Sequence, residues 1–119
     1  MEVIYSYSRQ RAIDDGFLID VTEPAREMGF RFPVAVTRSV WDTVLVPSPA
    51  DVTQDTSGRL WDCLWMLWLE IKRGGKGSEV FFSFAVNDEG REKLIHLKAF
   101  CHPGDNMEPV ITVMLPDED

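Results

Sequence analysis

The 119-residue sequence has no apolar run long enough to cross a membrane. Its most apolar stretch, LWDCLWMLWLEI at 60–71, has twelve residues, whereas a spanning helix needs about 20. The first residues, MEVIYSYSRQR, lack the basic-then-apolar order of a signal peptide. We therefore expect a cytoplasmic protein without membrane association.

Cysteine is scarce as well: only Cys63 and Cys101 occur, both inside apolar runs. One disulfide is fewer than disulfide-stabilised folds normally have, so buried free thiols in a reducing compartment are the better interpretation. The neighbouring histidines do not complete a metal site. Cys101 and His102 would point to opposite faces of a strand, and His96 would lie about 20 Å from His102 along it. We expect no metal and no cofactor.

The sequence also lacks the motifs that identify common reactions, namely a phosphate loop, GxSxG, HExxH and paired CxxC. We therefore predict a non-enzymatic protein. One alternative is an enzyme or small ligand-binding module at the segment YSYSRQR (5–11), which could hold a phosphate or a base. Its candidate residues are Tyr5, Tyr7, Arg9 and Arg11. A deep pocket that contains Arg9 or Arg11 beside a titratable group would favour this alternative.

Basic residues are few: 12 Lys and Arg stand against 20 Asp and Glu, giving a formal net charge of −8. Both halves of the chain carry the acidic excess. Such a surface repels the phosphate backbone, so we expect no direct binding to nucleic acid. It suits a protein partner with a basic surface, although acidity also serves solubility alone.

The first half of the chain predicts short helices joined by capped turns. Ser8 can cap a helix that Gly16 ends, and Thr22 can begin a second over 23–28. Thr37 can cap a third helix over 37–46. Segment 46–58 is a loop, after which Thr56 or Ser57 caps the apolar helix that contains 60–71 and ends at 74–75.

The second half changes to an alternating pattern at 77–86, 93–101 and 109–116, with turn sequences at 87–91 and 102–109. Three sequential strands with short connections predict an antiparallel meander. Helices first and strands afterwards indicate an α+β fold. We therefore predict a single domain over 1–119, with short N-terminal helices and one long apolar helix packed on a three-stranded antiparallel meander.

Two apolar stripes run along the predicted 60–71 helix. The first consists of Leu60, Leu64, Leu67 and Ile71, and the second of Trp61, Trp65 and Trp68. Together they are wider than the stripe of an ordinary surface helix, which predicts a helix covered on more than one side. One interpretation packs the tryptophans against Trp41 and the 37–46 helix. In the other, Trp61, Trp65 and Trp68 form an aromatic interface for a homodimer or a foreign partner.

The segments at 7–41, 57–71 and 96–119, with the YSR…DG start and the closing PGD…EPVIT run, resemble a family of small uncharacterised bacterial proteins. That family is catalogued only as a domain of unknown function, and its genes lie largely on plasmids, phages and integrated elements. The resemblance implies a genomic setting and supplies no catalytic residues.

Two interaction roles fit this setting. One is counter-defence, in which an acidic surface occupies a basic groove of an anti-CRISPR or anti-restriction target. Its candidate residues are Asp14, Asp15, Asp20, Glu23, Glu27, Asp117, Glu118 and Asp119. The other is an accessory protein of the mobile element that binds a partner through the aromatic stripe. Salt would weaken the first kind of binding and spare the second.

Overall fold

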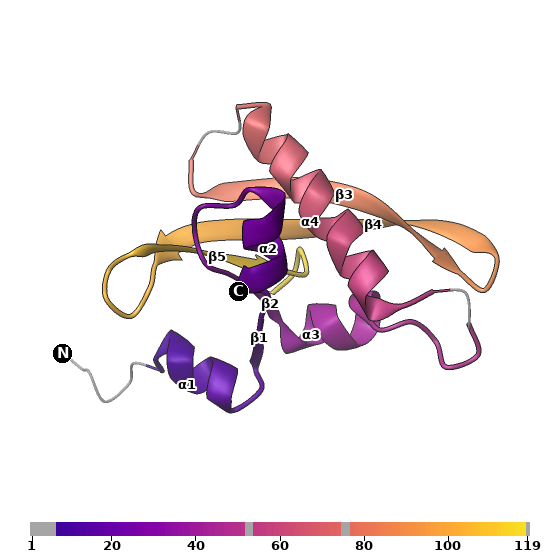
Figure 1. Ribbon diagram of the computed structural model, residues 1–119, viewed down its shortest axis with the longest axis horizontal. Helices are drawn as coiled ribbons and strands as arrows, with labels where there is room; N and C mark the ends of the chain where they lie inside the picture. Colours follow the sequence, from indigo (N-terminus) through magenta and orange to yellow (C-terminus); the bar gives the residue numbers. More distant parts are fainter. Residues whose placement is uncertain (1–6, 52–53, 75–76, 119) are drawn as a thin grey trace.

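The computed structural model describes residues 7–51, 54–74 and 77–118 of the chain (Figure 1). Its class is α+β, as the sequence predicts. The helices are α1 (Arg9–Asp14), α2 (Thr22–Met28), α3 (Arg38–Val40), which a π-helical turn at Trp41–Leu45 continues, and α4 (Thr56–Lys72). The strands are β1 (Leu18–Asp20), β2 (Val34–Thr37), β3 (Glu79–Asp88), β4 (Arg91–Pro103) and β5 (Pro109–Met114).

The five strands form one mixed sheet in the order β1-β2-β5-β4-β3. β3, β4 and β5 pair antiparallel in sequence order, whereas β2 lies parallel to β5 and antiparallel to β1. The expected three-stranded antiparallel sheet is therefore wrong, because two strands from the first half extend it. β1 has three residues and β2 has four, too few to show an alternating pattern in the sequence. Most of β2 is also buried on both faces, so its residues do not alternate between apolar and polar.

The predicted caps of two short helices are confirmed. The Ser8 hydroxyl accepts a hydrogen bond from the backbone N–H of Arg11 at 3.0 Å, at the start of α1. The Thr37 hydroxyl does the same for Val40 at 3.2 Å, at the start of α3. Gly29 ends α2 at a φ of 121°, a conformation that residues with a side chain rarely adopt.

The cap of α4 differs from the prediction. Asp55, rather than Thr56 or Ser57, is the N-cap, and its carboxylate accepts a hydrogen bond from the Gly58 N–H at 2.6 Å. Its backbone is extended, whereas Thr56 already belongs to the helix. A carboxylate in this place also interacts favourably with the positive end of the helix dipole.

The side of α4 that faces the sheet carries Leu60, Cys63, Leu64 and Leu67, all buried. The opposite side is exposed, so the prediction of a long apolar helix is wrong and α4 is amphipathic, although α2 also contacts it beside the sheet. The reason lies in the architecture. The helices on this face form one layer, and Figure 1 shows α4 crossing the long strands with α2 beside it. No further layer of described residues covers α4 from outside.

The sheet alternates as predicted along β3. Phe82, Phe84 and Val86 point into the core beneath α4, while 59% of Phe81, on the other face, is exposed. The predicted hairpin loop is also confirmed: a tight turn with positive φ at Glu89 and Gly90 joins β3 to β4.

Among the described residues, α1 covers one end of the other face of the sheet. Thr112 of β5 alternates with the core residues Ile111 and Val113, so its side chain lies on this other face. Arg9 of α1 donates a hydrogen bond to the Thr112 hydroxyl at 2.8 Å. The chain therefore places α1 and α2 on opposite faces of the sheet, with edge strand β1 between them.

Arg59 links the start of α4 to two other segments. Its side chain is buried and donates hydrogen bonds to the carbonyl oxygens of Val44, at 2.9 Å, and Asn87, at 2.7 Å. Nearby, the Asp51 carboxylate accepts a hydrogen bond from the Glu89 N–H at 2.9 Å. These bonds hold the β3–β4 turn against the first turn of α4 and the loop that precedes it.

Replacement of the α4 cap tests its assignment. We expect Asp55→Ala to lower the free energy of unfolding by about 1 kcal/mol, because the Gly58 N–H loses its partner at the helix start. Ser57→Ala, in the first turn, is the matched control and should change it by less than about 0.5 kcal/mol. Urea denaturation measures both. An equal loss in the two variants would show that Asp55 is not the cap.

Candidate functional site

The exposed side of α4 presents four apolar residues in helical register: Trp61, Trp65, Met66 and Leu69. We call this set the α4 outer face. Trp61 and Trp65 leave 44% and 45% of their surface exposed, which is high for the largest apolar side chain. Adjacent exposed aromatic and aliphatic groups of this kind are typical of protein interaction sites.

Trp68 plays a different part from the other two tryptophans. It is half-buried and packs against the core. Its indole edge lies against Gly29, where an added Cβ would come within 3.3 Å of the indole nitrogen. Its ring stacks on Trp65 with centroids 5.7 Å apart and an interplanar angle of 5°. The three tryptophans of the predicted aromatic interface therefore differ in their surroundings. Trp68 fills the junction of α2 and α4 and stacks against Trp65, whereas Trp61 and Trp65 are exposed.

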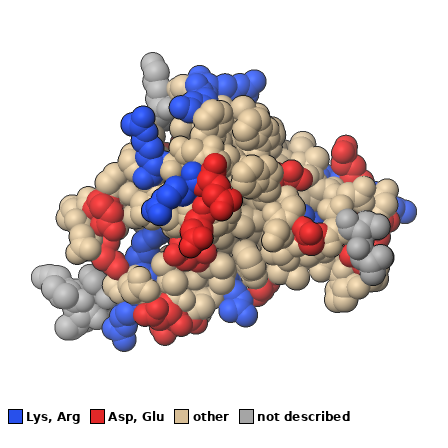
Figure 2. Space-filling model, viewed as in Figure 1, with Lys and Arg blue, Asp and Glu red and all other residues tan. Residues whose placement is uncertain are grey.

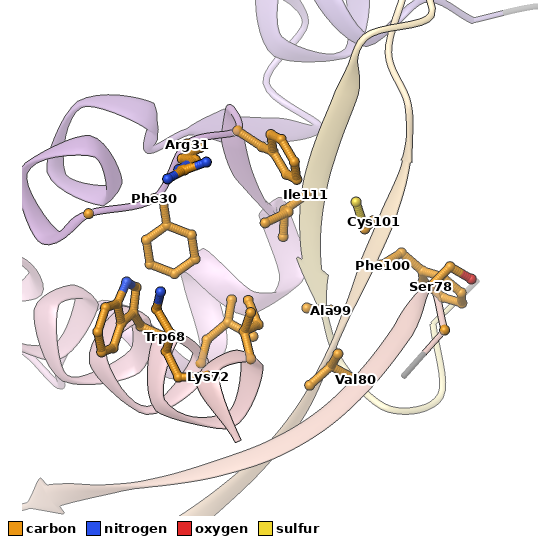
Figure 3. Close-up of a pocket in the computed structure, with 15 residues that line it drawn as sticks. Phe30, Arg31, Trp68, Lys72, Ser78, Val80, Ala99, Phe100, Cys101 and Ile111 are labelled. Carbon is orange, nitrogen blue, oxygen red and sulfur yellow. The ribbon is translucent and has the colours of Figure 1, made fainter. Parts of the chain in front are cut away.

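A cleft of about 260 Å³ opens between the C-terminal end of α4 and the sheet (Figure 3). Leu67 is fully buried, whereas Ile71, one turn later on the same stripe, is exposed. α4 therefore leaves the sheet at its last turn, and the space between them is the cleft. In Figure 3, Phe30, Arg31, Trp68 and Lys72 line the helical side and face Val80, Ala99 and Ile111 on the sheet side.

The sequence gives no local signal for this cleft. Its walls come from segment 29–32, the end of α4, and strands β3, β4 and β5, which are far apart in the chain. Only the pairing of the strands brings these segments together. Cys101, one of the two free cysteines, also lines the cleft and is half-buried. The other, Cys63, is fully buried beneath α4, where burial raises the pKa of its thiol.

The acids predicted between residues 14 and 27 lie on both faces of the sheet. Asp14 and Asp15 belong to α1 and its C-cap, whereas Glu23 and Glu27 are exposed on α2. Asp20 lies at the end of β1 between them and accepts a hydrogen bond from the Thr22 N–H at 3.0 Å. Figure 2 shows acidic and basic side chains interspersed on the face seen there. Closeness in sequence therefore does not place these acids on one face.

The acids of the C-terminus are also separated. Glu118 accepts hydrogen bonds from the Thr37 hydroxyl and the Leu115 N–H, both at 2.8 Å, and so anchors the end of the chain to β2. Asp117 is exposed. Asp119 lies outside the described residues. Glu118 thus has a structural role that competes with any use of its carboxylate for a partner.

A second hollow, of about 540 Å³, lies beside α1 and contains Arg9 and His102, the combination that would favour a ligand-binding module. These groups already have partners in the fold. Arg9 donates to the Thr112 hydroxyl and to the Ile111 carbonyl oxygen, and His102 Nε2 lies 2.8 Å from the same hydroxyl. Burial lowers the pKa of Arg9. Tyr5, another predicted ligand residue, lies outside the described residues.

Two further findings concern the described residues only. They contain no group of three or more His, Cys, Asp or Glu that could hold a metal ion. No helix among them is long and apolar enough to cross a membrane.

One side-chain pair has no signal in the sequence. Ser83 Oγ and His96 Nδ1 lie 2.7 Å apart across the β3–β4 pair, on the face away from α4.

The three tryptophans of α4 should differ in their contribution to stability. We expect Trp68→Ala to lower the free energy of unfolding by about 3 kcal/mol, because it leaves a cavity at the α2–α4 junction. Trp61→Ala should lower it by less than about 1 kcal/mol, because much of that side chain is already in water. Denaturant titration of both variants checks the order. Comparable losses would mean that Trp61 is covered in solution.

Comparison with known proteins gives one match. No curated protein and no solved structure matches the chain significantly. The model of a family of unknown function, DUF6573, matches residues 1–119, over the whole of the helical and strand segments described above. The sequence resemblance is thereby confirmed at the level of the family, and the chain belongs to this family of unknown function, DUF6573.

Proposed function

We propose that this protein is a non-enzymatic interaction module whose α4 outer face docks into an apolar groove with a basic rim on another protein. The observation that carries the proposal is the exposure of Trp61 and Trp65 on a helix that is otherwise well packed. Burying each ring would remove about 150–250 Å² from water, a large gain for one side chain. Tryptophan is also the residue type most enriched among those that dominate binding energy.

The geometry suits a helix that lies in a groove. The α4 outer face projects side chains at positions i, i+4, i+5 and i+8, a pattern by which an amphipathic helix occupies an apolar cleft. Trp65 stacks on Trp68, and this contact restricts its side chain, so less side-chain freedom remains to be lost on binding. Both features favour apolar contact as the main source of affinity.

The charge of the chain adds a preference for a basic rim. Asp62 is exposed on α4, one turn before Met66 and two turns before Leu69. It therefore lies within the α4 outer face and needs a positive partner when the face is covered. The net charge of −8 would accelerate association with a basic protein at low salt. In this proposal the acids steer the encounter and the apolar side chains hold the complex.

The partner class that we propose is a nucleic-acid-processing complex, because such complexes present basic grooves. CRISPR effectors and restriction enzymes are the versions that the genomic setting of the resemblance suggests. Mimicry of nucleic acid by the acids alone has less support, because Asp14 and Asp15 lie on the face of the sheet opposite to Glu23 and Glu27. An account based only on charge would need these acids on one surface.

Affinity capture with matched variants tests the proposal. The wild type should retain its partner from host lysate in both low and high salt, because apolar contacts resist screening. The double variant Trp61→Ser with Trp65→Ser should lose it. The control Phe81→Ser with Leu94→Ser removes apolar side chains of higher exposure, 59% and 61%, from the opposite face of the sheet and should retain it.

Other outcomes would contradict the proposal in distinct ways. Loss of the partner in high salt and in Glu23→Lys with Glu27→Lys, but not in the tryptophan variant, would favour charge mimicry. A wild type that sediments as a dimer, with the tryptophan variant sedimenting as a monomer, would make a second copy of the chain the occupant. Retention of the partner by every variant would exclude both surfaces.

A further inference from the structure

The cleft at the end of α4 is separate from the α4 outer face and has a composition of its own. Its inner wall is apolar, with Leu67 from the helix and Val80, Ala99 and Ile111 from the sheet. Phe30 closes it on the helical side (Figure 3). Besides two cations, the described lining residues with a polar side-chain group are Trp68, Ser78 and Cys101.

The charge of this lining is opposite to that of the chain as a whole. Arg31 and Lys72 are the charged residues that line the cleft in the described part of the chain, and no carboxylate lines it there. The whole chain carries 20 acids against 12 basic residues. A random sample of its charged residues would therefore be mostly acidic. Two cations beside an apolar wall form a field that favours an anion with an apolar body.

Arg31 and Lys72 are both exposed residues at the edge of the cleft. The Lys72 ammonium lies 5.0 Å from the centroid of the Trp68 ring, which attracts it and restricts where it can go. Both residues are exposed, so they lie at the rim of the cleft rather than on its floor. An anionic head group at the rim could meet them without being taken fully out of water, which limits the loss of its hydration.

The volume limits the size of the ligand. At about 260 Å³ the cleft is just below the range for drug-sized small-molecule sites, about 300–1,000 Å³. This is too small for a dinucleotide and suits one short hydrocarbon chain. We propose that the cleft binds a small amphipathic carboxylate, whose chain lies against the sheet wall and whose carboxylate faces Arg31 and Lys72.

Equilibrium dialysis of the full-length protein against octanoate tests the proposal. Octanoate should bind saturably with one molecule per chain. Hexanoate should bind about 15-fold more weakly, because each buried methylene contributes about fourfold to affinity. Heptylamine, with the same seven-carbon alkyl chain and the opposite charge, should not bind measurably. The absence of saturable octanoate binding, or equal binding of heptylamine, would overturn the proposal.

Matched variants test the role of the cations. Lys72→Met keeps an apolar stem and removes the charge, and we expect it to weaken octanoate binding about fivefold to tenfold. Arg31→Met should have a similar effect. Arg73→Met is the control, because Arg73 is the next residue after Lys72, is exposed and does not line the cleft. Equal effects of Lys72→Met and Arg73→Met would mean that only net charge matters, contrary to the proposal.

Chemical-shift mapping by NMR locates the bound octanoate in the protein. The indole N–H of Trp68 and the backbone amides of Ala99 and Cys101 should shift with octanoate concentration, and the indole N–H of Trp61 should not. The two indole groups serve as an internal comparison on one helix. Shifts that gather instead around Arg9 and His102 would place the ligand in the other hollow and overturn the assignment to this cleft.

Discussion

The rest of the structure depends on the packing of α4 against one face of a single sheet. Leu60, Leu64 and Leu67 bury themselves on strands whose inward residues include Phe82 and Phe84. A sheet can cover only one side of a helix, and the other helices on this face lie beside α4 rather than over it. The apolar residues that remain on α4 must therefore face water until something covers them, which is why its outer face is the main functional candidate.

The same packing produces the cleft. α4 follows the sheet through Leu67 and leaves it by Ile71, so its last turn lies above a gap instead of a packed core. Phe30 and Trp68 close the side of that gap without filling it. Two distinct surfaces thus arise from one helix: an apolar outer face where cover is missing, and a recessed apolar cleft where contact with the sheet ends. They differ in charge, because Asp62 lies within the first and only cations line the second among the described residues.

Local sequence signals predict local features of this protein well. Ser8 and Thr37 cap helices because their hydroxyls need only a backbone N–H three residues away. The alternation of β3 follows from burial on one face alone. The pairing of β2 with β5 is different, because it joins residues 34–36 to residues 111–113 and the short β2 shows no alternation. The prediction of a three-stranded sheet is therefore wrong, because the missing strands are short and β2 pairs with a strand that is far away in the sequence.

The candidate sites show the same difference between local and non-local sequence signals. The positions of Trp61 and Trp65 beside the leucine stripe are visible in the sequence, whereas the inward role of Trp68 depends on Gly29, 39 residues earlier in the chain. The predicted acidic residues are separated in space for a related reason. They are adjacent along the chain, but edge strand β1 carries the chain from one face of the sheet to the other between them.

The most direct test of this account is the solvent accessibility of the four indole N–H groups, measured by NMR with a neutral soluble paramagnetic probe. The account predicts strong broadening for Trp61 and Trp65 and clearly weaker broadening for Trp68 and Trp41, independent of protein concentration. Protection of Trp61 and Trp65 equal to that of Trp68 would contradict it, because the α4 outer face would then already be covered in the isolated protein.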